Sequence, residues 1–262
     1  MRKKKKSGRN TSLALIFFAL IICAIFASIL VKVLLVVKSS KFAEGPTFSI
    51  FVSNSKENEI ITYHKDKNSI SVIKLEEKVG DVYKFSEIPV SSVYYSEDLD
   101  FEKPAGELTS DIFFGIPRSK NNLNTYDGIR ILLMSKTINP KDIRRKEIPK
   151  ELAESQRDEI FSSLFSDPKI AQERLTIQIV NDTGEQGIGN RFSRIASNIG
   201  GSVVLVSSSE KNMKSGIYTQ NSSYTAGRLS EVLNFPLREG KMGGIGDIIV
   251  VIGQDYKNLT KY

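Results

Sequence analysis

The stretch LTIQIVNDTGEQGIGNRFSRIASNIGGSVVLV, residues 175–206, contains a strand, a turn, a helix and a second strand in succession. Leu175, Ile177 and Ile179 recur at every second position, which predicts a half-buried strand that ends at Asn181. Gly187 opens a helix whose apolar side chains form one continuous stripe. These side chains are Ile188, Phe192, Ile195, Ala196 and Ile199. The stretch therefore predicts a compact β-α-β unit.

The residues that follow complete a small domain over residues 174–257. The pattern predicts strands at 203–206, 217–219 and 248–252, and a second helix that ends at Asn234 before Pro236. The resulting order, β-α-β-β-α-β, is typical of a two-layer sandwich with both helices on one face of the sheet.

Three glycines, Gly184, Gly187 and Gly189, lie between the first strand and the first helix of this domain. Backbone N–H groups at such a junction can hold a phosphate. However, the spacing is not the dinucleotide-binding pattern, and no Gly-Lys-Ser/Thr triplet occurs. We therefore expect these glycines to serve the turn and the close packing of helix on strand, with phosphate binding as the alternative.

Residues 46–136 predict a second, smaller domain of mixed α/β structure. A strand at 48–52 and a hairpin at 59–63 and 70–75 come first, and shorter strands are expected at 82–85 and 91–95. A helix over 104–114 and an apolar run of strand length at 129–134 follow. Residues 137–173 are rich in charge and predict a linker with one amphipathic helix. In this linker Arg144 and Arg145 are expected to be solvated.

The N-terminus has the pattern of a membrane anchor. Residues 1–11 are basic, and residues 12–37 are mostly apolar and carry no charge apart from Lys32. A helix needs roughly 20 apolar residues to cross the hydrocarbon core, so this segment is long enough. Basic residues stay on the cytoplasmic side, which predicts a single-pass type II protein with its domains outside. Residues 38–46 are expected to form a stalk.

The positive charge belongs to this anchor. Residues 1–40 hold eight of the 37 lysines and arginines and no acid, which leaves 29 basic against 30 acidic side chains in the rest. Because nucleic-acid binding needs a concentrated cationic surface, we expect no nucleic-acid partner. The only cysteine, Cys23, lies in the apolar segment, so no disulfide is expected outside the membrane.

Few residues outside the anchor suggest catalysis. The only histidine, His64, has no pattern of metal ligands or nucleophile around it and is expected at the surface of a strand end. The acids Glu76 and Glu77, and Asp98, Asp100 and Glu102, are expected to be solvated rather than to hold a metal. We expect neither a metal nor a cofactor.

The C-terminal domain resembles the LytR C-terminal domain of bacterial envelope proteins. That family opens with a strand ending in Asn-Gly-Thr-Gly and closes with a strand of the form Asp-x-x-Val-Val-Leu-Gly-x-Asp-Tyr. The matching residues are Asn181, Thr183, Gly184, Gly187, Asp247, Gly253, Asp255 and Tyr256. Asp182 replaces the usual first glycine, and Gly189 replaces a usual alanine.

In that family the domain commonly follows a LytR-CpsA-Psr catalytic domain, which transfers a lipid-linked polymer to peptidoglycan. Residues 46–136 resemble a shortened form of it. Where the family carries Ile-Pro-Arg-Asp, this chain has Ile73-Lys74-Leu75-Glu76-Glu77, so the arginine that grips the phosphate has no counterpart. The alternative is a shortened phosphotransferase that uses other arginines for the polyprenyl phosphate. Those candidates are Arg118, Arg130, Arg144 and Arg145.

The leading hypothesis is therefore a non-catalytic envelope protein with a C-terminal binding module. Its partner would be a cell-wall polymer or another envelope protein, and residues 12–37 would contact membrane lipid. A transcription regulator, which the older family name suggests, does not fit the charge distribution. We expect the binding site to comprise Asn181, Thr183, Gly184, Gly187, Arg191, Asp255 and Tyr256.

Overall fold

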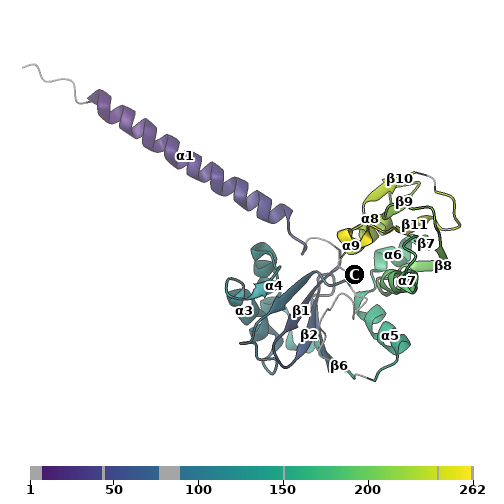
Figure 1. The fold of residues 1–262 in the computed structure, drawn as a ribbon. Helices are drawn as coiled ribbons and strands as arrows, with labels where there is room; N and C mark the ends of the chain where they lie inside the picture. The colour runs from purple at the N-terminus through teal and green to yellow at the C-terminus, as the bar shows by residue number, and fades with distance from the viewer. Residues whose placement is uncertain (1–7, 43–44, 77–88, 150, 241, 261–262) are drawn as a thin grey trace, which may run out of the picture.

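A computed structural model describes residues 8–42, 45–76, 89–149, 151–240 and 242–260. One long helix, α1 (Gly8–Lys38), projects from a folded part that contains two mixed sheets (Figure 1). The mixed α/β class predicted from the sequence is confirmed. The strand expected at 82–85 lies outside the described residues.

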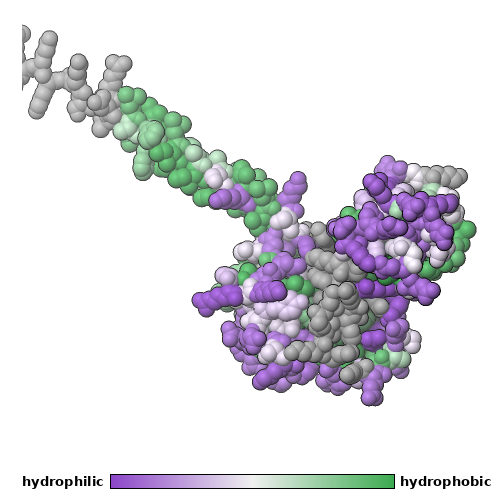
Figure 2. All heavy atoms as spheres, in the orientation of Figure 1, coloured by the Kyte–Doolittle hydropathy of each residue, from purple (hydrophilic) through white to green (hydrophobic). Residues whose placement is uncertain are grey.

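Helix α1 is long and apolar enough to span a membrane. Its segment Leu13–Lys38 has 26 residues, and its large apolar side chains are exposed rather than packed against the rest of the protein. Figure 2 shows this segment as a mostly apolar rod with one hydrophilic patch in its second half, whereas the visible surface of the folded part is mostly hydrophilic. In water such a rod would be strongly unfavourable, because burying apolar surface is the main driving force of folding.

The chain just after α1 is bound to the first domain, which differs from the stalk expected at residues 38–46. The hydroxyl of Ser40 and the backbone N–H groups of Lys41 and Phe42 all donate to the buried carboxylate of Asp127. The side-chain amide of Asn124 donates to the carbonyl of Val36 at 2.8 Å. These polar contacts, which the low hydrophobicity of the segment concealed, fix the end of α1 to the start of helix α4 (Thr125–Thr137).

The N-terminal sheet has six strands in the order β5-β4-β1-β2-β3-β6. The strands are β1 (Thr47–Ser53), β2 (Asn58–His64), β3 (Ser69–Leu75), β4 (Ser92–Tyr95), β5 (Lys120–Asn121) and β6 (Ile143–Ile148). β1, β2 and β3 form an antiparallel meander, whereas β4 runs parallel to β1 and β6 parallel to β3. The carboxyl ends of β1, β3, β4 and β6 therefore lie at the same edge.

Helices cover both faces of this sheet. Leu108 and Ile112 of α3 (Ala105–Gly115) and Ile131 of α4 pack on the face that carries Ile61 and Val72. The run Ile129–Met134 is thus helical, and its prediction as a strand was wrong. Ile131 is buried whereas Ile129 and Leu133 are exposed, so the run has helical rather than strand periodicity.

The predicted linker over residues 137–173 is structured along its described length. Residues 140–142 form a short 3₁₀ turn, η1 (Pro140–Asp142), and β6 then pairs with β3. β6 is an edge strand with four exposed residues, which explains why its charges concealed it. Phe161 and Phe165 of α5 (Glu154–Phe165) pack on the second face of the N-terminal sheet. A further helix, α6 (Pro168–Glu173), was not expected.

The C-terminal sheet has five strands in the order β10-β9-β11-β7-β8. They are β7 (Thr176–Asn181), β8 (Ser202–Ser208), β9 (Gly216–Thr219), β10 (Leu237–Glu239) and β11 (Ile248–Ile252). Helices α7 (Ile188–Asn198) and α8 (Tyr224–Leu233) bury their apolar stripes on one face, as predicted. A short helix, α9 (Tyr256–Leu259), follows β11. The exposed, three-residue strand β10 is an addition to the predicted order.

The two parts of the fold meet through α5. The guanidinium of Arg194, on α7, forms two hydrogen bonds with the carboxylate of Asp158, at 2.8 and 3.1 Å. Glu154 lies 3.1 Å from the same guanidinium. α5 therefore uses its apolar side for the N-terminal sheet and its acidic side for the C-terminal sandwich.

Candidate functional site

The C-terminal residues expected to bind a partner converge at one edge of the sandwich. β7 and β11 are parallel, so Asn181 at the end of β7 and Gly253 just after β11 lie on the same side, where α7 begins. The phenol of Tyr256 donates to the carboxylate of Glu185 at 3.1 Å, which joins the loop after β7 to α9. Arg191 lies one turn into α7 and is half-buried.

Most of these side chains hold the loop in place. The side-chain oxygen of Asn181 accepts from the backbone N–H and the hydroxyl of Thr183, at 3.1 and 2.7 Å. Its amide donates to the carbonyl of Glu185, and the hydroxyl of Thr183 accepts from the N–H of Glu185. The Asn-x-Thr pattern is thus explained by a closed network that fixes the turn.

The glycines act as the turn and packing hypothesis expects. Gly184 and Gly187 have φ of 77° and 81°, a backbone region that glycine adopts without strain. A Cβ on Gly189 would lie 2.8 Å from a methyl carbon of Val206, so this glycine lets α7 approach β8. No side chain caps Gly187 at the start of α7. Its first-turn N–H groups therefore face outward, which is the arrangement that favours anionic groups.

Asp255 and Asp182 fasten the neighbouring loops. The carboxylate of Asp255 accepts from the N–H and the hydroxyl of Ser215, at 2.9 and 2.7 Å. Burial opposes its ionisation, but these hydrogen bonds outweigh burial and hold the pKa of Asp255 below its usual range. Asp182, where the LytR family usually has glycine, is buried and accepts from the N–H groups of Lys211 and Met213. From the sequence, Asp182 was identified only as a residue that differs from the LytR family pattern, and its role in holding residues 211 and 213 was not predicted.

The four candidate arginines of the phosphotransferase alternative lie on different elements, and none of them lines the main hollow of the described residues. Arg118 follows α3 and Arg130 lies on α4, with its guanidinium 5.5 Å from the centre of the Phe42 ring, whereas Arg144 and Arg145 lie on the edge strand β6. A hollow of about 760 Å³ between residues 89–91 and α8 is lined by Lys41 and Arg228 but by none of the four.

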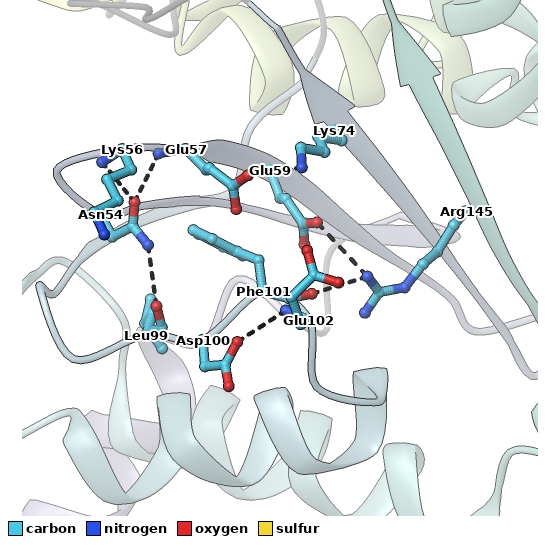
Figure 3. Close-up of polar contacts among 10 residues, drawn as sticks. All are labelled: Asn54, Lys56, Glu57, Glu59, Lys74, Leu99, Asp100, Phe101, Glu102 and Arg145. Atoms are coloured by element: carbon cyan, nitrogen blue, oxygen red, sulfur yellow. Dashed lines mark hydrogen bonds and ion pairs between the residues drawn. The ribbon is translucent and has the colours of Figure 1, made fainter.

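A polar cluster at the carboxyl edge of the N-terminal sheet was not predicted (Figure 3). Glu59, near the start of β2, points toward Arg145, and one of its oxygens lies 3.9 Å from that guanidinium. Arg145 also donates to the carbonyls of Phe101 and Lys103, at 2.9 and 2.7 Å. It thereby ties the loop before α3 to the sheet. Beside them, Lys74 pairs with Glu57 at 2.7 Å.

Glu59 is the unusual member of this cluster. Its side chain is 2% exposed, and its second oxygen has no hydrogen-bond partner among the described residues. Burial raises the pKa of Glu59 to about 7, because desolvation exceeds the opposing effect of Arg145. Such a group gains or loses a proton near neutral pH. Side chains alternate between the two faces of a strand, so Glu59 lies on the same face of β2 as Ile61 and Tyr63. This alternation could have predicted from the sequence that Glu59 is buried.

His64 is buried, so the expectation of a surface histidine was wrong. It lies at the end of β2, as predicted, but a ring nitrogen is 3.0 Å from the hydroxyl of Ser71 on β3. Burial lowers the pKa of His64 to about 4, and the charges of Lys67 and Arg144 add to this effect. Within the described residues, no group of three or more His, Cys, Asp or Glu side chains could hold a metal ion.

No protein-family model matches the chain, and no curated protein is similar to it in sequence. The chain has a weak structural likeness to a crystal structure from Listeria monocytogenes, of a protein described provisionally as a transcriptional factor. The two share 12% identity, and the alignment covers 42% of this chain and 86% of that one, with a TM-score of 0.26. A likeness at this level carries no argument about fold or function.

Proposed function

We propose that this chain is a single-pass envelope protein whose folded domains lie outside the cytoplasm and bind a cell-wall polymer or another envelope protein. In this proposal the protein is non-catalytic. Its C-terminal sandwich is a binding module of the LytR C-terminal type, and the N-terminal domain is a remnant of a LytR-CpsA-Psr domain.

The observation that carries the proposal is α1. Its apolar segment is exposed along its whole length, and the hydrocarbon core of a bilayer would remove these side chains from water. The basic residues that precede it favour a cytoplasmic N-terminus. The remaining 29 basic and 30 acidic side chains make a near-neutral exported part, which suits a partner other than nucleic acid.

The binding edge is assigned to the loop after β7 and the start of α7. Its turn is held by internal hydrogen bonds and needs no ligand to form. Gln186 and Asn190 project from it and are exposed. A preformed loop loses little conformational entropy on binding, which favours a recognition role. The phosphotransferase alternative would need arginines around a common pocket, and the separated positions of the four candidates favour the binding module.

A sedimentation experiment tests the binding module. The full chain, extracted in detergent, should co-sediment with purified cell-wall sacculi, or should crosslink to an envelope protein in intact cells. Gln186→Glu should weaken binding of an anionic wall polymer, because it places a carboxylate at the uncapped start of α7. Gln220→Glu is the matched control, since Gln220 is exposed far from this edge. Failure in both arms would remove the support for a binding module.

A further inference from the structure

The exposed side of α4 combines apolar and basic residues. Ile129 and Leu133 lie one turn apart on this side and are 40% and 57% exposed. Arg130 and Lys136 flank them and are exposed. The acid of this helix, Asp127, is on the buried side, where it binds residues 40–42. The exposed side of α4 therefore carries positive charge and no negative charge.

Further residues of the same character lie near the start of α4. Phe114, at the end of α3, is 71% exposed. Arg118 and Lys120 follow it in the chain and are exposed. The end of α3 lies against the start of α4, because a Cβ on Gly128 would come within 3.1 Å of the Phe113 ring. We call Phe114, Ile129, Arg130, Leu133 and Lys136 the α3–α4 patch.

The patch is held close to the membrane-spanning segment. Asn124, the residue that caps α4, binds the carbonyl of Val36 and the hydroxyl of Ser39, each at 2.8 Å. Asp127 holds the next residues, so little free chain separates α1 from α4. Figure 1 shows α4 directly beside the end of α1 that carries Lys38. A domain on this attachment cannot move far from the bilayer surface.

We infer that the α3–α4 patch rests on the outer surface of the bilayer that α1 spans, with its apolar side chains among the lipid headgroups. This inference rests on the proposed anchor. A helix with an apolar centre and basic flanks is the usual form of an interfacial membrane contact. Lys38, Arg118, Lys120, Arg130 and Lys136 would attract anionic headgroups. The contact would fix the orientation of the domains, and with it the direction of the C-terminal binding edge.

Spin labels on the full-length chain test this placement. Cys23→Ser removes the native thiol, and Ile25→Cys, Leu133→Cys and Ile245→Cys then give single sites in α1, in the patch and on the C-terminal part. Ile245 is 70% exposed and serves as the aqueous control. After reconstitution in vesicles rich in phosphatidylglycerol, collisions with oxygen report lipid, and collisions with a water-soluble nickel complex report water.

The label at position 133 should favour oxygen, as the label at position 25 does, whereas the label at position 245 should favour nickel. A position 133 label that favours nickel while position 25 favours oxygen would overturn the inference and leave the anchor intact. If the label at position 25 favours nickel, both the inference and the proposed membrane anchor are refuted. A label shielded from both reagents would indicate a protein contact and also overturn the inference.

A charge-reversal variant tests whether basic residues attract the patch to anionic lipid. Lys136→Glu should lower the oxygen preference at position 133 in these anionic vesicles. Lys146→Glu is the matched control, because Lys146 is also exposed but lies on β6, outside the α3–α4 patch. An unchanged oxygen preference in Lys136→Glu would contradict the attraction to anionic lipid.

Discussion

Two buried titratable residues on β2 oppose one another in their effect on stability. Glu59 has a pKa raised from 4.5 to about 7, so between these values the folded state keeps a proton that the unfolded state releases. Its contribution is complete below pH 4.5 and is lost as the pH rises to 7. His64 has a pKa lowered from 6.5 to about 4, so its contribution is complete above pH 6.5 and is lost as the pH falls to 4. Their slopes partly cancel.

Glu59→Gln should therefore reveal the slope of His64. The free energy of unfolding of this variant should rise with pH between about 4 and 6.5, and at pH 8 it should exceed the wild-type value by about 3 kcal/mol. Urea unfolding of the detergent-solubilised chain, monitored by near-ultraviolet circular dichroism, measures the pH dependence and the difference at pH 8. Glu57→Gln is the control, because that acid is one-third exposed and paired with Lys74. Equal pH profiles for Glu59→Gln and the wild type would refute the assignment.

His64→Gln should give the opposite profile. Without the histidine, the free energy of unfolding should fall as the pH rises from about 4.5 to 7, because only Glu59 remains. The same unfolding titration measures this slope. The two residues lie at opposite ends of β2, so their effects should add, and the double variant should be nearly independent of pH in this range. A steep double-variant profile would show that other groups dominate.

At the scale of the element, the contact of α7 with β8 depends on Gly189. Gly189→Ala would place a Cβ 2.8 Å from a Val206 methyl carbon, so we expect a loss of about 1–3 kcal/mol in the free energy of unfolding. Gly227→Ala, in α8, meets no atom within 4 Å and should instead gain about 0.5–1 kcal/mol. Chemical unfolding compares the two. A loss of the same size in both variants would mean that close packing is not the cause.

The connection of α1 to α4 depends on Asp127. Asp127→Ala leaves the N–H groups of Lys41 and Phe42 without their acceptor and should cost about 2–3 kcal/mol. It should also make residues 39–42 a site of rapid proteolysis in detergent, because Asp127 no longer holds them. Asp142→Ala, on the exposed η1 turn, should change neither. Slow cleavage in Asp127→Ala would contradict the proposal that Asp127 holds residues 40–42 against α4.

Strong periodicity was predictable, and weak or edge elements were not. The stripe from Ile188 to Ile199 and the alternation of Ile177 and Ile179 in β7 face the same core, so both elements were found. β7 is not half-buried as predicted, because Gln178 and Val180 on its other face are buried too. β6 was concealed because an edge strand with four exposed residues has little apolar pattern. The segment 129–134 was misassigned because a short apolar run fits a strand and a helix equally well. Asp127 and Arg145 could not be predicted, since their partners lie about 86 and 44 residues away.

At the scale of the whole molecule, the distribution of charge and the attachment of α1 act together. The positive charge of the chain is concentrated before and within its apolar helix, and the folded part is nearly neutral. The contacts of Asn124 and Asp127 with residues 36–42 then keep the N-terminal domain at the end of α1 instead of on a flexible stalk. We therefore expect the protein to present its C-terminal binding edge at a fixed distance from the membrane.

The most direct measurement of this account is the topology of the chain in intact bacterial cells. In a Cys23→Ser background, Lys5→Cys and Gln220→Cys place single thiols before and after α1. A membrane-impermeant maleimide should label Gln220→Cys in cells whose inner membrane is intact, and should label Lys5→Cys only after that membrane is permeabilised. Labelling of Lys5→Cys alone in intact cells, or recovery of the full-length chain in the soluble fraction, would contradict the proposed anchor and orientation.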